Sequence, residues 1–514
     1  MKKTLTLLLA LLLSLAPIAL AGELEPVTFD VYYVEGSGLS PGDLKIIQDY
    51  AAAHADHNVT INWISLGDPS VMAERISILF SSGEYGDATW QNPLQEADVS
   101  VLSAQGILQP LNDLITKENT PNLYKLFETV PSTKIISTLP DGNFYTLPRY
   151  VGNRGDFLES PIWVNKVWLE KLGLDIPTTA AEFEAMLIAF RDGDPNGNGR
   201  ADEIPMMIFD GDAFRHMEIW LGMFGIPTKS NNFDSCVYVK DGTVFFAPMQ
   251  EAYKDCIKWL NSLYAQNLIY QDLFTTTLET VTAKMNGEEP VIGVVTTKTL
   301  PKFQDEYAQI LPPAVEGYNT RWFYHPGSLG IKNFFSVTNA CKEPARLLAY
   351  FDDMWTTEQT LRNSYGPVGD VLIQREDGTY GFQDPPGGIS LGEYLMYNTM
   401  GVGMFVLYPE DYGTLFDISI TDQLMWASYE LYEPILNKEI WPRPFFTEGL
   451  AMRAAELRTD IFNTVNQKKA MWVTGQADID AEWDAFQANL KKMGVEEFIG
   501  ICQQAYDIFM ANIK

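Results

Sequence analysis

The stretch that decides the fold is Trp163–Pro205, which reads WVNKVWLEKLGLDIPTTAAEFEAMLIAFRDGDPNGNGRADEIP. It opens with a short β-branched and aromatic run, continues through two helical patterns and ends in a turn rich in Asp, Asn and Gly. Asn165 is expected to cap the first helix, which ends at Gly173. Thr179 and Glu182 have the spacing of a capping box for the second helix. The stretch therefore predicts a strand, two helices and a tight loop.

The chain before this stretch shows the same alternation of strand and helix. VTFDVYYV (27–34), VTINWI (59–64) and DATW (87–90) are β-branched and aromatic runs that predict strands. A helical pattern over 71–82 lies between the second and third of these runs. A hairpin-like segment with an Asp-Gly turn, LPDGNFYTLPRY (139–150), then precedes the deciding stretch. Strands that alternate with helices at these spacings predict parallel α/β sheets.

The second half of the chain adds two strands and becomes helical. PVIGVV (290–295) and SLGIKN (328–333) predict strands, and ACKEPARLLAYFDDMWTTEQ (340–359) predicts one long amphipathic helix. The region from 421 to 514 is almost wholly helical in pattern, with helix stops expected at the glycines Gly449, Gly475 and Gly494.

The pattern predicts two α/β lobes that share backbone. We expect residues 22–148 and about 325–390 to form an N-terminal lobe, and 149–324 and about 391–514 to form a C-terminal lobe. Because no long disordered linker separates them, the lobes are expected to be wound together by several crossings.

The first 21 residues have the pattern of a secretory signal. Lys2 and Lys3 precede an apolar run, and Ala19-Leu20-Ala21 forms a small-x-small cleavage site. A lipid-anchored protein would need a Cys after that site, where Gly22 stands. We therefore expect export to the periplasm or the cell exterior without a lipid anchor.

Charge argues against polyanionic partners. The net charge is −31, and without Lys2 and Lys3 the exported chain has 34 basic against 67 acidic residues, a net charge of −33. A surface this negative repels nucleic acid and anionic membranes at long range, although a local basic or calcium-lined pocket could override that repulsion.

The cysteines and histidines do not form a catalytic pattern. Cys236, Cys256, Cys341 and Cys502 include no CxxC pair, and none of the four His residues lies in an HExxH motif. Export permits a disulfide, with Cys236 and Cys256 the nearest pair in sequence, but four buried free thiols fit the spacing equally well.

The Asp/Asn/Gly turn predicts a calcium site. Counted from Asp194, oxygen donors fall at positions 1, 3, 5, 7, 9 and 10, with glycine at 6, as at the start of an EF-hand loop. The predicted donors are Asp194, Asn196, Asn198, the carbonyl of Arg200, Asp202 and Glu203. Position 12 is Pro205 in place of a bidentate Glu, so a structural Ca²⁺ site is expected and a sensor is not. The alternative is a plain turn, because these residues also favour turns.

Several segments together resemble the larger extracellular solute-binding proteins of ABC importers, family 1, the maltose-binding-like group that includes alginate-binding proteins. The deciding stretch carries the most specific resemblance, in its Trp-Leu-x-x-Leu-Gly-Leu helix, Pro-Thr-Thr cap and DPNGNG loop. SSGEYGDATW (81–90), DGNFYTLP (141–148) and the C-terminal WVTGQADIDAEWDAFQANLKK (472–492) add to it.

The resemblance has definite implications for fold and partners. It implies a two-lobe periplasmic-binding-protein fold of type II with a helical C-terminal region, a ligand cleft between the lobes and a membrane permease as partner. It also implies that the calcium loop is structural and remote from the ligand. Many relatives carry a lipid anchor, whereas here no Cys follows the expected cleavage site and we expect no anchor. We expect a monomer.

A carbohydrate cleft needs aromatic rings for the apolar sugar faces and fork-like polar groups for the hydroxyls. Trp90 and Trp322 are the strongest candidates, because polar residues and turns adjoin them. Core packing is the competing explanation for each single aromatic residue. The full set of candidate ligand-binding residues is Trp90, Asn92, Tyr145, Arg149, Arg154, Trp220, Arg321, Trp322, Trp426, Trp441 and Arg443.

Two other functions remain open. An exported glycoside hydrolase would also be acidic and rich in Trp, and its carboxylate pair could lie anywhere among 67 acidic residues. The same fold could instead bind a peptide, a polyamine or a metal complex. We expect no enzymatic activity and an oligosaccharide-like ligand.

Overall fold

The first sheet gathers strands from distant parts of the chain. The computed structural model describes residues 24–35, 39–91, 93–158, 160–210, 216–228, 236–298, 302–324, 331–400 and 406–513, so the expected signal at 1–21 lies outside the described residues. The sheet has the order β15-β4-β12-β3-β1-β2. Its strands are β1 (Val27–Tyr33), β2 (Val59–Ser65), β3 (Ala88–Trp90), β4 (Thr146–Val151), β12 (Ile331–Val337) and β15 (Val406–Leu407). β1 pairs in parallel with β2 and β3, whereas β12 is antiparallel to β3 and β4.

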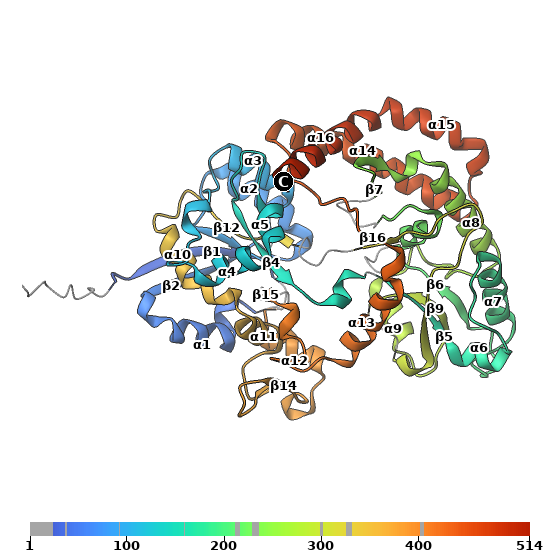
Figure 1. The fold of residues 1–514 in the computed structure, drawn as a ribbon, viewed down its shortest axis with the longest axis horizontal. Helices are drawn as coiled ribbons and strands as arrows, with labels where there is room; N and C mark the ends of the chain where they lie inside the picture. Colours follow the sequence, from blue (N-terminus) through green and yellow to red (C-terminus); the bar gives the residue numbers. More distant parts are fainter. Residues whose placement is uncertain are drawn as a thin grey trace, which may run out of the picture.

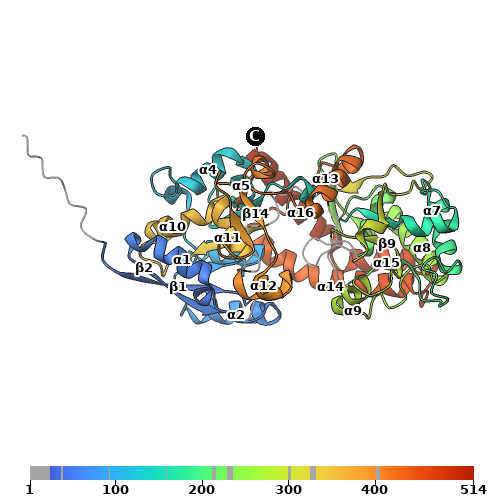
Figure 2. The same ribbon diagram turned by 90° about the horizontal axis from the view of Figure 1, so that it is seen from below.

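The second sheet is smaller and is also mixed. It has the order β10-β5-β9-β6, and its strands are β5 (Ile162–Asn165), β6 (Ile204–Met207), β9 (Ile292–Thr296) and β10 (Tyr307–Ile310). β6 and β9 are parallel, with Ile204 opposite Ile292, while β5 is antiparallel to β9 and β10. Figures 1 and 2 show the two sheets with their helices as two bodies side by side along the long axis. The expected two-lobe α/β architecture is therefore present.

Three two-stranded pairs complete the strands of the described residues. β7 (Val237–Lys240) and β8 (Thr243–Phe246) form a hairpin, as do β13 (Leu372–Gln374) and β14 (Tyr380–Phe382). β11 (Trp322–Phe323) pairs in parallel with β16 (Leu436–Asn437) between the two large sheets.

The helices divide between the two bodies. Around the first sheet lie α1 (Lys45–Ala53), α2 (Pro69–Ser82), α3 (Glu96–Ala104), α4 (Pro121–Thr129), α5 (Pro131–Ser137), α10 (Pro344–Phe351), α11 (Thr357–Tyr365) and α12 (Leu391–Asn398). Around the second lie α6 (Lys166–Leu172), α7 (Ala180–Asp192), α8 (Glu251–Ala265), α9 (Leu278–Met285), α13 (Ile420–Tyr432), α14 (Glu448–Val473), α15 (Ile479–Lys492) and α16 (Val495–Ile513). Of these, α14 also contacts α3 and α16 also contacts α5, both beside the first sheet. No helix among the described residues is both long enough and apolar enough to span a membrane.

The deciding stretch folds as its local signals predict. The Asn165 side chain accepts a hydrogen bond from the Trp168 N–H at 3.1 Å, and α6 ends at Gly173, whose φ is 65°. Thr179 and Glu182 form a complete capping box at the start of α7. These contacts satisfy backbone N–H groups that a helix end otherwise leaves unpaired, so the sequence of this stretch specifies its own helix boundaries.

Two expected helix boundaries are wrong. The long helix over 340–359 is divided into α10, a 3₁₀ turn at Asp352–Trp355 and α11, which the Thr356 side chain caps. The division turns Asp352 toward the start of α4, where its carboxylate accepts from the backbone N–H groups of Asn122 and Leu123 at 2.8 and 3.0 Å. Gly449 does not stop a helix either, because it lies in the first turn of α14, whereas Gly475 and Gly494 do follow helix ends.

Cysteine thiols pack within the hydrophobic cores. All four are buried, and none forms a disulfide. Burial raises the pKa of the Cys341 thiol to about 12, so this sulfur remains protonated at neutral pH. The thiols therefore act as small apolar side chains.

Helix α13 attaches the later part of the chain to the second sheet. The Tyr432 hydroxyl is buried and donates to the Ile310 carbonyl on β10 at 2.6 Å. The same hydroxyl accepts from the Ile162 N–H on β5 at 3.0 Å. Burial raises the pKa of Tyr432, so its hydroxyl keeps the proton that it donates. One side chain thus pairs two backbone groups at the edge of the sheet.

Replacing Tyr432 with Phe should destabilise the protein by about 2 kcal/mol, because it leaves a buried N–H and a buried carbonyl without partners. Urea unfolding measures the change. The matched control is Tyr397→Phe on α12, whose side chain is 53% exposed and whose replacement should change little. Equal stabilities of Tyr432→Phe and the wild type would contradict this assignment.

Candidate functional site

The chain passes between the two sheets in several places, and α13 contacts both bodies. Its Met425 belongs to the core beside the second sheet, whereas Trp426 packs against the cluster around Leu372 and Tyr412 beside the first. The Trp426 Nε1–H donates to Asn153 Oδ1 at 2.6 Å, in the segment that leads from β4 to β5. Trp426 therefore ties α13 to a crossing segment.

Aromatic side chains gather at the same crossing. Phe157, Tyr324 and Tyr429 are all half-buried, and the Phe157 ring centroid lies 5.9 Å from the centroids of both tyrosine rings. Phe157 follows β4, Tyr324 follows β11 and Tyr429 lies on α13, so three separate segments contribute. Arg154, in the same 3₁₀ turn as Phe157, is exposed. Ring faces beside a guanidinium group can recognise the apolar faces and hydroxyls of a sugar.

An ion cluster joins the first sheet to the segment before α14. Glu96 at the start of α3 pairs with Arg443 at 3.1 Å, and the Lys332 ammonium on β12 lies 4.0 Å from the Glu96 carboxylate. Lys332 also donates to the Arg443 carbonyl and lies 4.0 Å from the centre of the Phe445 ring. Burial alone would raise the pKa of Glu96, but Arg443 and Lys332 outweigh it and lower the pKa below its usual range.

A cavity of about 170 Å³ lies beside this cluster. It is bounded by Gln95 and Glu96 after β3, by Trp441 and Arg443, and by Arg458 on α14. The cavity lies between the start of α3, beside the first sheet, and helices α14 and α16. Its volume is below the ~300 to 1,000 Å³ of usual ligand pockets, so it can hold only part of an oligosaccharide.

The structure distributes the predicted ligand-binding residues over different environments. Arg149, Trp426, Trp441 and Arg443 are half-buried, and Arg154 and Arg321 are exposed. Tyr145 is buried and donates to Asp141 at 2.7 Å, with burial, then Asp141, raising its pKa to about 12. Asn92 lies outside the described residues.

Trp90, Trp220 and Trp322 lie within the hydrophobic cores and have no exposed surface. The Trp90 ring lies 4.8 Å from the Phe351 ring, centroid to centroid, and three further aromatic rings surround it. A Cβ at Gly222 would come within 2.8 Å of the Trp322 ring, so only glycine fits there. At these three positions no ring face is exposed to stack against a sugar as predicted, because apolar neighbours already pack against each indole.

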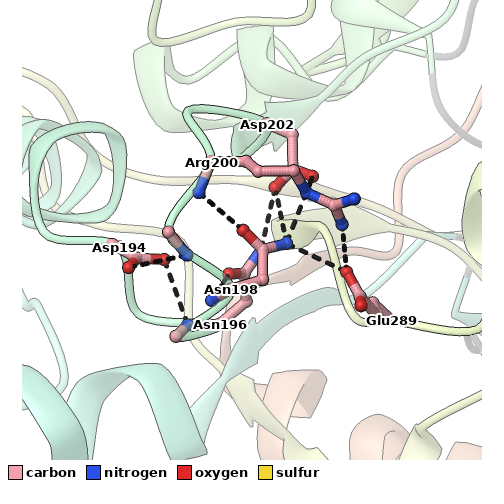
Figure 3. Close-up of polar contacts among 8 residues, drawn as sticks. Asp194, Asn196, Asn198, Arg200, Asp202 and Glu289 are labelled. Atoms are coloured by element: carbon pink, nitrogen blue, oxygen red, sulfur yellow. Dashed lines mark hydrogen bonds and ion pairs between the residues drawn. The ribbon is translucent and has the colours of Figure 1, made fainter.

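The predicted calcium loop adopts a tight turn (Figure 3). The Asp194 carboxylate accepts from the Gly197 and Gly199 N–H groups, each at 3.1 Å. Both glycines have positive φ, 78° and 72°, which glycine adopts without steric cost. Asn196 and Asn198 direct their amide NH₂ groups to the Asp202 carboxylate at 2.9 and 3.2 Å.

The carboxylate, amide and carbonyl oxygens of the loop are the donors that a hard cation prefers, although the side-chain oxygens do not all face one point. In the described part of the chain, no three His, Cys, Asp or Glu side chains are arranged to hold a metal ion. Glu203 Oε1 is nevertheless buried without a hydrogen-bond partner among the described residues. Burial, then Asp202 and Asp194, raise the pKa of Glu203. Rotating the two Asn amides would exchange NH₂ groups for oxygens beside these carboxylates, as Ca²⁺ coordination requires.

One residue at the loop has no counterpart in the predicted set. Glu289, in the turn before β9, accepts from the Asn198 amide at 2.9 Å and pairs with the Arg200 guanidinium. No spacing rule indicates it, since it lies 86 positions after Glu203. The pairing of β6 with β9 brings it to the loop.

The architecture of two α/β bodies joined by several crossings is shared with two-lobe solute-binding proteins. No protein-family model matches the chain. The fructooligosaccharide ABC transporter substrate-binding protein FusA of Streptococcus pneumoniae is 28% identical, over 95% of this chain and 93% of that protein. Its structure with kestose has a TM-score of 0.81, with 25% identity, and covers 95% of this chain and all of that one. A FusA EF-hand mutant with fructo-nystose matches equally well.

Two further solved structures share the fold. An HMO-binding solute-binding protein of Bifidobacterium longum infantis has a TM-score of 0.82 at 23% identity, covering 94% of this chain and 99% of that one. The alginate-binding protein AlgQ2, in a structure without calcium ion, has a TM-score of 0.71 at 19% identity, covering 94% and 98%. Together with the similarity to FusA, these matches show that the chain shares the fold of ABC-transporter substrate-binding proteins and is similar to one of them in sequence.

Replacing Glu96 with Gln should cost about 2 kcal/mol of stability at pH 7, because it removes the anion that faces Arg443 and Lys332. The folded-state pKa of Glu96 lies below its ordinary value of 4.5. The contribution of Glu96 is therefore complete above pH 4.5 and is lost as the pH falls through the folded-state pKa.

The measurement is urea unfolding of the wild type and Glu96→Gln between pH 3 and 7. The stability difference should shrink on the acid side of pH 4.5. A difference that stays the same at pH 3 and pH 7 would show that the charge of Glu96 contributes nothing.

Proposed function

We propose that this protein is the extracytoplasmic solute-binding component of an ABC importer, and that it closes its lobes around an oligosaccharide and releases it intact. The single observation that carries the proposal is the pair of α/β sheets whose crossing segments bring half-buried aromatic rings and an arginine together. FusA with kestose and the HMO-binding protein support a saccharide as the ligand class.

The proposed lobes follow the two sheets. The first lobe comprises 22–148 with the region from about 325 to beyond β15, and the second comprises 149–324 with the rest of the chain. The parallel pairing of β15 with β4 supports a boundary later than residue 390. Closure about the crossing segments would bring the two bodies onto a ligand between them.

The proposed ligand site centres on Phe157, Tyr324 and Tyr429, with Arg154 beside them. Half-buried rings combine fixed positions with an exposed face, unlike the enclosed indoles of Trp90 and Trp322. Arg149, Arg321, Trp426, Trp441 and Arg443 remain candidates for further polar or stacking contacts. Exported proteins of this kind are expected to deliver the ligand to a membrane permease, and we propose that this one acts as a monomer in the periplasm or outside the cell.

Replacing Tyr429 with Ala should weaken oligosaccharide binding roughly three- to tenfold, the value of about 0.5 to 1.5 kcal/mol for one aromatic stacking contact. Isothermal titration calorimetry with a panel that includes kestose measures the dissociation constant. Tyr397→Ala is the matched control, because its ring is exposed on α12. Equal losses in both variants, or none in either, would contradict the proposed site.

The same titration distinguishes transport from hydrolysis. A binding protein returns the oligosaccharide unchanged, whereas a glycoside hydrolase produces shorter saccharides. Mass spectrometry of the ligand after prolonged incubation with the protein detects cleavage. Turnover above that of a buffer control would overturn the non-enzymatic assignment.

We further propose that the 194–203 loop binds a structural Ca²⁺ through Asp194, Asn196, Asn198, the Arg200 carbonyl, Asp202 and Glu203. The unpartnered Glu203 oxygen and the alternating oxygen donors support the assignment. The FusA EF-hand mutant and the AlgQ2 structure without calcium ion indicate that such sites occur in relatives. The loop lies between α7 and β6, and bound calcium would hold that connection closed.

Adding Ca²⁺ to chelator-stripped protein at 100 times the dissociation constant should stabilise it by about 2.7 kcal/mol. Differential scanning calorimetry should show a higher melting temperature for the wild type and a much smaller shift for Asp194→Asn. Asp175→Asn, before α7, is the control and should behave as the wild type. If calcium does not change the melting temperature of the wild type, the loop is a plain turn that binds no cation.

A further inference from the structure

The turn before β9 reaches the calcium loop through the second sheet. β6 and β9 pair in parallel, and the Ile204 N–H donates to the Val291 carbonyl at 2.7 Å. This bond joins the end of the loop to the residue two positions after Glu289. The backbone therefore holds the Glu289 side chain against the loop, although no local motif connects the two segments.

Glu289 contacts two residues of the loop at once. Its Oε2 accepts from Asn198 Nδ2 at 2.9 Å and pairs with Arg200 Nη2. The Arg200 Nε lies 3.1 Å from Asp202 Oδ2, so the guanidinium group bridges Asp202 and Glu289. Without Glu289, the only charged partner of Arg200 among the described residues would be Asp202, a predicted calcium ligand.

A guanidinium group that pairs with a metal ligand opposes the metal. It competes for the carboxylate oxygens, and its positive charge repels a divalent cation. A carboxylate outside the ligand set weakens both effects, because it neutralises the guanidinium charge and competes with the metal ligand for its N–H groups. Hydrogen bonds of this outer kind commonly change metal affinity 10- to 100-fold.

We propose that Glu289 is a positioning residue for the calcium loop, which shares the Arg200 guanidinium with Asp202 and so weakens the competition of that guanidinium with Ca²⁺ for the Asp202 carboxylate. The inference rests on the proposed calcium site. The loop has Pro205 at position 12, so it has no carboxylate of its own there. We infer that Glu289, from another part of the chain, supplies the carboxylate that pairs with Arg200.

Glu289→Gln should weaken calcium binding about tenfold, because the amide keeps an acceptor oxygen but loses the charge that pairs with Arg200. The measurement is calcium titration calorimetry on the full chain after chelator treatment. Glu288→Gln is the matched control, because the neighbouring Glu288 side chain is 95% exposed and pairs with Lys302 at 3.3 Å. Its calcium affinity should equal that of the wild type.

A double-mutant cycle separates positioning from direct coordination. If Glu289 acts through Arg200, then Glu289→Gln should change affinity less than twofold in an Arg200→Gln background. A tenfold loss in that background would overturn the positioning function, as would an unchanged affinity of Glu289→Gln in the wild-type background. If the wild type does not bind calcium, both the calcium site and the positioning function of Glu289 are wrong. If the wild type binds calcium but the Glu289 variants do not behave as expected, only the positioning function is wrong.

Discussion

The crossing of the chain between its two sheets is the constraint on which the rest of the structure depends. Each sheet takes strands from distant parts of the sequence, and β15 joins β4 only after the chain has built the whole second sheet. The second body in turn receives α13 to α16 only after the chain has returned through the first, so neither body is one continuous stretch of chain. The residues at the crossings are held by both bodies, and a ligand that binds there contacts groups whose positions depend on the relation between them.

Helix α13 shows how one element serves both bodies. Tyr432 pairs backbone groups of β5 and β10, and Trp426 lies against the cluster beside the first sheet. A helix attached in this way can transmit a change in lobe position to Tyr429, which lies on it near Phe157. Ligand binding and lobe closure would then involve the same movement of α13, as in hinge-type domain closure.

Buried tryptophans and half-buried aromatic rings lie in different environments in this protein. Trp90, Trp220 and Trp322 fill the interior, where a large ring contributes stability through packed contacts. Phe157, Tyr324 and Tyr429 keep part of each ring accessible. The 194–203 loop is separate again, since it joins α7 to β6 within one body, where the proposed Ca²⁺ would make that connection more rigid.

The sequence by itself determined the features that depend on near neighbours. The caps of α6 and α7, the strands β1 to β3 and the turn at Asp194 follow from residues a few positions apart, because capping and turn bonds close within one or two turns of backbone. The α/β class followed from the alternation of these elements. The ring faces of Trp90 and Trp322, the division of the 340–359 helix by Asp352 and the approach of Glu289 to Arg200 were decided only by the tertiary structure. Each depends on a partner far away in sequence, and local spacing contains no information about which distant segments a sheet will bring together.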